Sequence, residues 1–247
     1  MKKLLLAIAC VWSVQHADVV YKMLATTSGL PGMDDVSTTI EVSIKGDRSR
    51  DEMTINDPLI GRKRFVHITR LDKGLKWTLD TQRMRYSETA FRSIPEPVQE
   101  KAVTDSGIHV LVERPGKTKE VLDNTCEEVI ISVLSETDTL PLVSQHMWVC
   151  RDFEGYAEID SFFDRLIGLG NVAPFSPSMV GEAGYMRAFQ DTVQNIDGFP
   201  LEATMYMVFG SEDAQYVMEM HSIVTELATD ALDDNLFEIP AGYTLSE

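Results

Sequence analysis

Four methionines have the residue type and spacing that most suggest chemistry in this sequence. Met205 and Met207 lie two residues apart, as do Met218 and Met220, on either side of a polar turn signal at 210–213. Because residues two apart in a strand point to the same face, a hairpin here places Met207 beside Met218 and Met205 beside Met220. Thioethers can ligate copper(I), fill an irregular core or line an adaptable apolar cavity. The sequence has no Met-x-x-Met run to favour copper, which leaves core and apolar cavity as the two interpretations.

Nucleophilic catalysis has no convincing residue set in this sequence. A serine or cysteine nucleophile needs a nearby base, and the sequence lacks the Gly-x-Ser-x-Gly elbow that positions one. Each histidine after the first 17 residues is isolated on a strand-like segment, and we interpret each as a half-buried strand residue. These histidines are His67, His109, His146 and His221.

Other candidate motifs lie in predicted elements that do not suit the chemistry they suggest. Residues 168–173 match the dinucleotide pattern Gly-x-Gly-x-x-Ala, but they follow a helical pattern rather than a strand. Glu127 and Glu128 would point to opposite faces of a strand, and Asp233 and Asp234 are expected to be solvated acids in a turn. We therefore predict no catalytic residues, no metal site and no cofactor.

The first 17 residues have the pattern of an export signal. Lys2 and Lys3 precede an apolar run at 4–12 that is too short to span a bilayer. We predict a signal peptide at 1–17, a single domain at 18–247 and a periplasmic location, with no transmembrane segment. Acylation of Cys10, as in a lipoprotein, is the alternative for this leader.

Two cysteines remain after the leader and form an even pair. Cys126 and Cys150 would lie in an oxidising compartment, where a disulfide between two strands is the natural expectation. No His or Cys lies at zinc spacing around either residue, so a metal site is not favoured.

Charge is distributed unevenly along this acidic chain, whose formal net charge is −17. Residues 45–119 hold 16 Lys and Arg against 11 Asp and Glu, whereas residues 120–247 hold 3 against 24. Either strands of the two halves lie together and attract, or the basic half forms a patch for anionic head groups or a partner. The overall balance argues against nucleic acid as a partner.

Apolar periodicity predicts many short strands followed by two helices and a hairpin. Turn signals separate the strand patterns, which favours an antiparallel sheet. The expected strands are Asp18–Thr27, Val36–Ile44, Ser49–Ile55, Arg64–Leu71, Leu75–Asp80, Met84–Glu88, Ile108–Glu113, Thr118–Val121, Glu127–Leu134 and Leu142–Cys150, and the hairpin spans Leu201–Leu227.

The expected helices are recognised by an apolar residue every three or four positions. Apolar residues recur at this spacing from Tyr156 to Ile167, and a second helix is expected from Ser176 to Asn195. A short helix could also begin near Ile94 and end at Val103.

Several stretches resemble one family of exported bacterial domains of unknown function. They are Ile68–Asp72, Trp77–Asp80, Asn124–Cys126, Gly198–Leu201 and the closing Phe237–Tyr243. Those domains are similar to outer-membrane lipoprotein carriers of the LolA and LolB type. The resemblance implies an α+β fold, in which a strongly curved antiparallel sheet, a half-barrel, has helices covering its concave face. In the carriers this cavity holds acyl chains, but their positioning arginine has no assignable counterpart here.

These observations lead to the hypothesis of a periplasmic, non-enzymatic protein that binds a lipid or acyl chain between sheet and helices. Apolar side chains of the hairpin would line the cavity and those of the helices would form its lid. The expected ligand-binding residues are Met205, Met207, Phe209, Met218, Met220, Phe162, Phe163, Met186 and Phe189. The alternative is an interaction or envelope-sensor module with a packed interior, which contacts another envelope protein through a sheet edge or through Arg62, Lys63 and Arg64.

Overall fold

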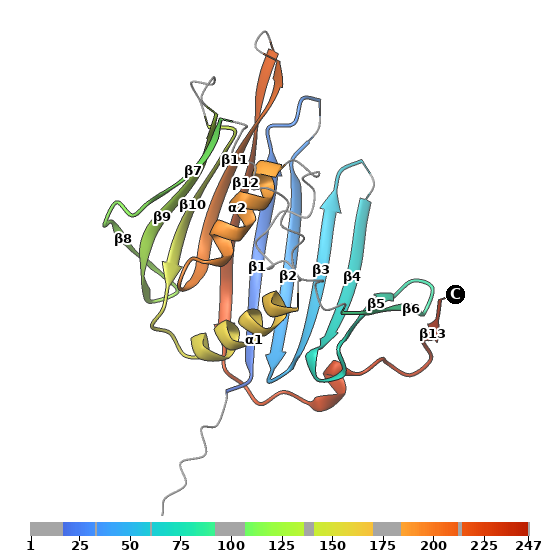
Figure 1. The fold of residues 1–247 in the computed structure, drawn as a ribbon. Coiled ribbons are helices and arrows are strands. Elements are labelled where there is room, and N and C mark those ends of the chain that lie inside the picture. The colour runs from blue at the N-terminus through green and yellow to red at the C-terminus, as the bar shows by residue number, and fades with distance from the viewer. Residues whose placement is uncertain are drawn as a thin grey trace, which may run out of the picture.

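A single large sheet organises the chain. The computed structural model describes residues 17–32, 34–59, 61–91, 107–135, 141–169, 184–211 and 214–246. Within these ranges, 13 strands form one sheet in the order β13-β6-β5-β4-β3-β2-β1-β12-β11-β10-β9-β7, and β8 pairs with β9 beside this path (Figure 1). The strands are β1 (Val19–Ser28), β2 (Val36–Lys45), β3 (Arg48–Asp57), β4 (Gly61–Arg70), β5 (Leu75–Asp80), β6 (Arg85–Ala90), β7 (Ile108–Glu113), β8 (Thr118–Val121), β9 (Asn124–Ser135), β10 (Val143–Cys150), β11 (Phe199–Ser211), β12 (Ala214–Ala228) and β13 (Thr244–Leu245).

Nearly all strand pairs are antiparallel, because most connections are short turns between consecutive strands. The exception is β13, which lies parallel to β6 at the edge of the sheet. The first and last long strands, β1 and β12, pair in the middle of the sheet and so join its two halves. The expected curved antiparallel sheet is confirmed, with one parallel edge pair that the sequence did not indicate.

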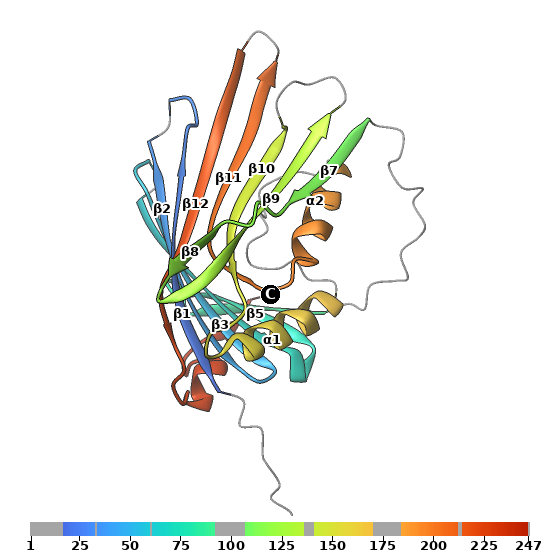
Figure 2. The same ribbon diagram turned by 90° about the vertical axis from the view of Figure 1, so that its left-hand side faces the viewer.

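Two helices lie on one face of this sheet. They are α1 (Tyr156–Gly168) and α2 (Gly184–Gln194), and Figure 2 shows the sheet bending around the side that they occupy. Gly155 has φ of 91° just before α1, and a Cβ there would lie 2.7 Å from a methyl group of Val19. A glycine is therefore needed for the chain to enter α1 so close to β1.

The Met-rich hairpin has the register that its spacing predicts. Met205 pairs with Met220 and Met207 pairs with Met218 across β11 and β12. The alternation in β11 is also confirmed, because Leu201, Ala203, Met205 and Met207 are all buried. The dry face of this hairpin thus belongs to the core on the helix side.

A disulfide joins Cys126 of β9 to Cys150 of β10, and the two Cα atoms are 4.4 Å apart. Both residues are fully buried in a core cluster that also contains Tyr21, Phe162 and Phe199. The predicted link between two strands is therefore confirmed.

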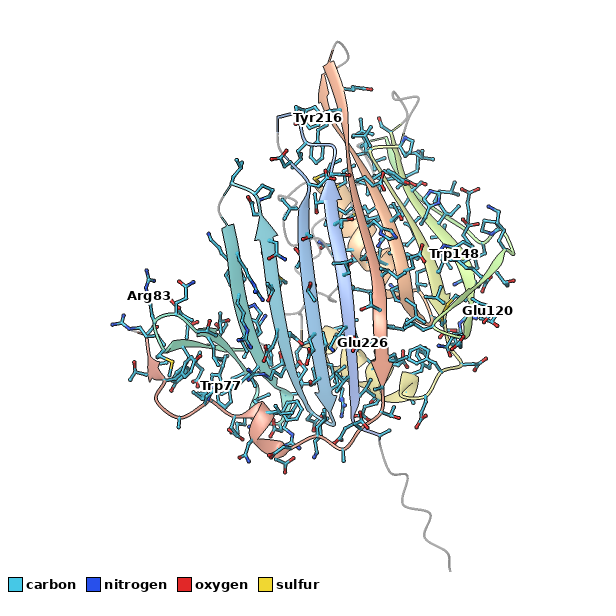
Figure 3. The ribbon with its side chains drawn as sticks, turned by 180° about the vertical axis from the view of Figure 1, so that it is seen from behind. Trp77, Arg83, Glu120, Trp148, Tyr216 and Glu226 are labelled. Carbon is cyan, nitrogen blue, oxygen red and sulfur yellow. A yellow bond between two sulfur atoms is a disulfide. The ribbon has the colours of Figure 1, made fainter. Side chains whose placement is uncertain are left out.

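The C-terminal segment crosses the sheet on the face opposite the helices. Its short 3-10 helix, η2 (Asp234–Phe237), inserts Phe237 into a core cluster with residues of β4 and β5, including Ile68 and Trp77. Figure 3 shows this face, with Trp77 on β5, Trp148 on β10 and Glu226 on β12. This packing gives a structural role to the ending Phe237–Tyr243, which is part of the family resemblance.

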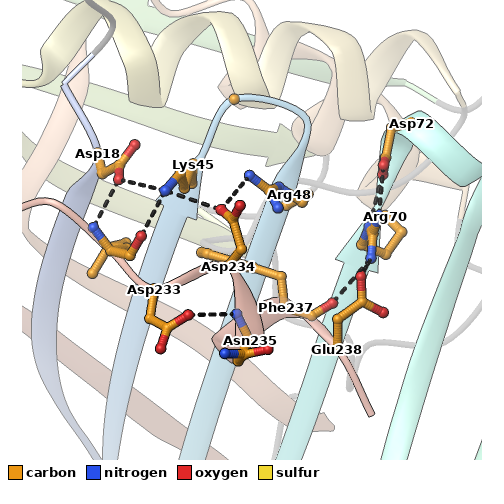
Figure 4. A network of polar contacts seen from close by, with 12 residues as sticks. Asp18, Lys45, Arg48, Arg70, Asp72, Asp233, Asp234, Asn235, Phe237 and Glu238 are labelled. Carbon is orange, nitrogen blue, oxygen red and sulfur yellow. Dashed lines mark hydrogen bonds and ion pairs between the residues drawn. The ribbon is translucent and has the colours of Figure 1, made fainter.

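Ion pairs also join the C-terminal segment to the ends of strands β2, β3 and β4 (Figure 4). Asp234 lies 3.0 Å from both Lys45 of β2 and Arg48 of β3. Arg70 of β4 is bonded to Glu238 and donates to the carbonyl oxygen of Phe237 at 3.2 Å. The side chain of Asp234 is 69% exposed, as a solvated acid should be, but folding also brings two cations from distant strands to it, which the sequence did not indicate.

The uneven distribution of charge along the sequence is explained in part by ion pairs between the two halves of the chain. Lys119 lies 2.6 Å from Glu202, and Lys117 lies 3.0 Å from Glu128. Basic residues before position 120 thus pair with acidic residues after it, as the first interpretation of the asymmetry expected.

Most of the remaining expected elements are confirmed within one to three residues at their ends. The first strand begins one residue later than expected, β5, β7 and β8 match exactly, and α1 extends to Gly168. Three expected features lie outside the described residues: the predicted signal peptide up to position 16, the short helix expected near Ile94 and the first turns of the helix expected from Ser176.

Candidate ligand-binding site

A small apolar pocket lies where the two helices meet the sheet. Its volume is about 80 Å³. Helix α1 contributes Ile159, Phe163 and Ile167, which are four residues apart and therefore share one helix face. The other apolar lining residues are Met147, Val149, Val193, Ile196, Phe199 and Pro200.

The floor of the pocket depends on the tight connection between α2 and β11. Gly198 has φ of 110°, and a Cβ at this position would lie 2.5 Å from a methyl group of Val149. The chain can therefore pass directly over β10 and place Phe199 beneath α1. There the Phe199 ring stacks on Phe163 with centroids 6.5 Å apart, while the ring of Tyr21 meets its edge at 5.3 Å. These rings fix the shape of the pocket wall.

The mouth of the pocket is acidic. Asp160 and Asp164 line it from α1, and the hydroxyl of Tyr156 lies 3.2 Å from a carboxylate oxygen of Asp160 and 3.4 Å from one of Asp197, so that its single proton is shared between two acceptors. Burial and then the negative charge of Asp164 raise the pKa of Asp160 above its usual value, with Asp197 acting in the same direction and the Tyr156 bond opposing them. Burial and the two neighbouring carboxylates raise the pKa of Tyr156 to about 12. The hydroxyl of Tyr156 therefore stays protonated and remains a donor at neutral pH.

The residues predicted to bind a ligand fall into three groups. Only Phe163 lines the pocket. Met205, Met207, Met218 and Phe189 are buried together in the core next to it, with Met220 and Phe209 packed against them. Phe162 is buried in a neighbouring cluster around Tyr21 and Phe199, and the side chain of Met186 lies outside the described residues.

Sequence reasoning missed most of the residues that line the pocket. Ile159 and Ile167 belong to the apolar periodicity of α1, so that signal was present. Val193 belongs to the apolar pattern of the second expected helix, whereas Ile196 and Phe199 line the pocket because the α2–β11 connection passes close to Val149 of β10. No spacing within the sequence indicates that contact.

A second hollow, of about 570 Å³, lies between the β8–β9 turn, the segment before α1 and the end of β12. Its lining mixes apolar residues with charged ones, and several of its polar groups have partners. Glu226 pairs with Lys22 at 2.6 Å, and Glu154 accepts from Thr229 at 2.7 Å. The apolar pocket is therefore the better candidate for a ligand site.

The histidines of the described chain form no cluster. His67 contacts the hydroxyl of Thr78 at 3.1 Å, His146 lies 4.0 Å from Glu128, and His221 lies 3.6 Å from Glu202. Within the described ranges, no group of three or more His, Cys, Asp or Glu side chains is arranged to hold a metal ion. Likewise, no helix in those ranges is long and apolar enough to cross a membrane.

The basic stretch Arg62–Lys63–Arg64 lies on β4, where successive side chains point to opposite faces. All three residues are exposed, and Arg64 is bonded to Glu52 of β3. The stretch is therefore divided between two faces of the sheet and forms no single patch.

Comparison with known proteins identifies a family. The model of the domain of unknown function DUF4412 matches residues 30–243. This chain belongs to the DUF4412 family. The match covers every described strand from β2 to β12, so the DUF4412 fold includes both halves of the sheet, both helices and the C-terminal segment up to Tyr243. Among curated protein sequences, none matches the chain.

Solved structures similar to this DUF4412 chain include a putative outer membrane lipoprotein-sorting protein domain from Vibrio parahaemolyticus. Identity is 10%, coverage is 90% of this chain and 89% of that chain, and the TM-score is 0.30. A DUF1329 family protein from Desulfovibrio piger has 10% identity, coverage of 91% of each chain and a TM-score of 0.32. The sequence-based resemblance to a family of domains of unknown function is confirmed by the DUF4412 match.

A third similar structure is the MucA/MucB complex of Pseudomonas aeruginosa. One of its chains has 9% identity, coverage of 87% of this chain and 94% of that chain, and a TM-score of 0.26. At TM-scores of this size, none of the three similarities carries an argument about ligand or partner.

Proposed function

We propose that this protein is an exported, non-enzymatic binding protein, a single domain over residues 18–247, that takes the end of a lipid or acyl chain between sheet and helices. The observation that carries this proposal is the apolar pocket between α1, α2, β10 and β11. It is concave, its walls are built mainly from aliphatic and aromatic side chains, and its polar groups gather at the mouth. Sites for small apolar ligands in proteins have this composition.

The volume of the pocket determines how much of a ligand can enter it. At about 80 Å³ it is smaller than a cavity of roughly 150 Å³ that holds benzene, so it accommodates only the last few carbons of a chain. Each buried methylene contributes about 0.8 kcal/mol. Affinity in this pocket therefore comes from a short apolar end.

A longer chain would have to enter the methionine cluster that packs next to the pocket. Met147 and Val149 line the pocket and also pack in the same cluster as Met205, Met207 and Met218. Methionine side chains are unbranched and adapt to a new neighbour more readily than branched ones. A longer chain would extend from the pocket along this face, under Phe189 of α2.

The experiment that tests this proposal is displacement of a fluorescent fatty-acid probe, combined with native mass spectrometry of the protein after mild purification. Val193→Phe adds volume inside the pocket and should weaken probe binding at least tenfold. Val217→Phe makes the same change on an exposed part of β12 and should leave binding unchanged. Absence of probe binding and of co-purified lipid in the unmodified protein would refute the proposal.

The alternative of a partner docked on Arg62–Lys63–Arg64 has less support, because β4 divides these side chains between two faces. Reversal of all three charges should therefore leave capture of other envelope proteins unchanged. Loss of a captured protein after that change would favour the interaction module.

A further inference from the structure

Two acids at the mouth of the pocket, Asp160 and Asp164, have no cationic partner among the described residues. Asp160 and Asp164 are exposed on α1, one turn apart, and like charges at this spacing repel. Neither carboxylate forms an ion pair with a lysine or arginine of the described chain, although Arg165 beside them pairs with Asp47 at 2.6 Å. Within the described chain, α1 therefore bears two acids without a cationic partner, one turn apart and beside an apolar pocket.

Neighbouring groups add to this field. Asp197 lies on the other side of Tyr156, and its charge is partly offset by Arg151 at 2.9 Å. Tyr156 itself lines the pocket, and the face of its ring attracts cations. The whole segment after residue 119 is strongly acidic, so the long-range field has the same sign as the local one.

We infer that the ligand of this pocket carries a positively charged head on its apolar tail, as in an alkylammonium amphiphile. The tail occupies the space between Phe163, Val193 and Phe199, and the head lies at the mouth between Asp160, Asp164 and the ring of Tyr156. This inference rests on the proposed function, because it requires that the pocket accept an apolar chain.

The same geometry disfavours an anionic head. A carboxylate or phosphate at the mouth would face Asp160 and Asp164, which lie one helical turn apart. The hydroxyl of Tyr156 could not donate to it freely, because its single proton is already shared by Asp160 and Asp197. Charge complementarity therefore selects among amphiphiles that have the same tail.

The test compares three probes with one tail, namely hexylammonium, hexanol and hexanoate, by NMR titration of the full chain. The expected order of affinity is hexylammonium first, hexanol about fivefold weaker and hexanoate weakest. This preference should shrink at high salt, because exposed charges are screened. The expected shifts are at Ile159, Val193 and Phe199.

Variants of the protein distinguish the contribution of the cationic head to affinity from that of the apolar tail. Asp160→Asn combined with Asp164→Asn should bring hexylammonium to the affinity of hexanol and leave hexanol unchanged. The double change removes a repulsion on α1, so it should not unfold the protein. Glu113→Gln, an exposed acid on the distant edge strand β7, is the control of matched chemistry and should have no effect.

Two outcomes would overturn the inference in different ways. Equal binding of the three probes, or tightest binding of hexanoate, would refute the cationic head and leave the proposed apolar site intact. Absence of shifts at the pocket with all three probes would refute both.

Discussion

Two titratable side chains lie in a row of polar residues on the helix side of β3, β4 and β5. Their contributions to the free energy of unfolding change in opposite directions with pH. Asp51 and His67 pair across β3 and β4, and Thr78 follows on β5. Burial raises the pKa of Asp51 to about 6, although Lys76 and a bond from Ser49 oppose the change. Burial and then the charge of Lys76 lower the pKa of His67 to about 4.

The two shifts have opposite consequences for the free energy of unfolding. Between pH 4 and 6 the folded protein keeps a proton on Asp51 that the unfolded chain has released, so the contribution of Asp51 falls as pH rises. Between pH 4 and 6.5 the unfolded chain protonates His67 and the folded protein does not, so the contribution of His67 increases as pH rises. In the unmodified protein the two largely cancel.

The magnitude follows from about 1.4 kcal/mol for each unit of pKa shift. Both side chains are half-buried, and solvent screening reduces each contribution to about 1–2 kcal/mol over the window. We therefore expect Asp51→Asn to become more stable relative to the unmodified protein as pH increases from 4 to 6.5. We expect the reverse trend, of similar size, for His67→Gln.

The assay is urea denaturation at half-unit steps of pH, with each variant compared with the unmodified protein so that all other titrating groups cancel. Tyr21→Phe is a useful companion, because the buried Tyr21 hydroxyl has no hydrogen-bond partner within the described chain. Its removal should not destabilise the protein. Flat difference curves, or curves with the same sign for Asp51→Asn and His67→Gln, would refute the reasoning.

Three further predictions concern how much the contacts of the C-terminal segment and the disulfide contribute to the free energy of unfolding. Arg70→Ala should lower the free energy of unfolding by about 2–3 kcal/mol in urea denaturation, because it removes the donor to the carbonyl of Phe237 and the cation that bonds both Asp72 and Glu238, of which only Glu238 keeps a second cation within the described chain, Lys73 at 3.3 Å; a loss below about 0.5 kcal/mol would contradict this role. Phe237→Ala should cost about 3–5 kcal/mol in the same assay, because the side chain is fully buried, and near-wild-type stability would show that the C-terminal segment is not part of the core. Cys126→Ala with Cys150→Ala should cost about 3 kcal/mol, since the bridge closes a loop of 24 residues, and the unmodified protein should lose the same amount under reductant; an effect of only one of the two treatments would contradict the assignment.

The sequence predicted the strands and the hairpin register well because these depend on local alternation. Met205 and Met207 are two apart and the turn signal lies between them and Met218, so the register of β11 and β12 could be predicted from spacing alone. The parallel pairing of β13 with β6 could not, because Thr244 meets Arg85 through a long excursion of the chain. The ion pairs of Asp234 could not be predicted for the same reason, since its partners Lys45 and Arg48 are almost 190 residues away.

The candidate site was predicted only in part. The apolar face of α1 was evident from periodicity, and Phe163 does line the pocket. The methionines were assigned to the ligand because they share a face, but whether a face contacts a ligand or another element depends on tertiary packing. Here Phe189 of α2 packs with the methionines, and the pocket lies beside them, where Gly198 lets Phe199 approach α1.

The most direct test of the proposed function is the dependence of affinity on tail length. Titration of the full chain with alkylammonium probes from butyl to dodecyl should show Kd falling about fourfold for each added methylene until the tail fills the pocket, which follows from about 0.8 kcal/mol per buried methylene. The Val193→Phe variant should reach its limiting affinity at a shorter tail than the unmodified protein. A Kd that is independent of tail length, or a dependence that Val193→Phe leaves unchanged, would contradict a ligand bound between the helices and the sheet.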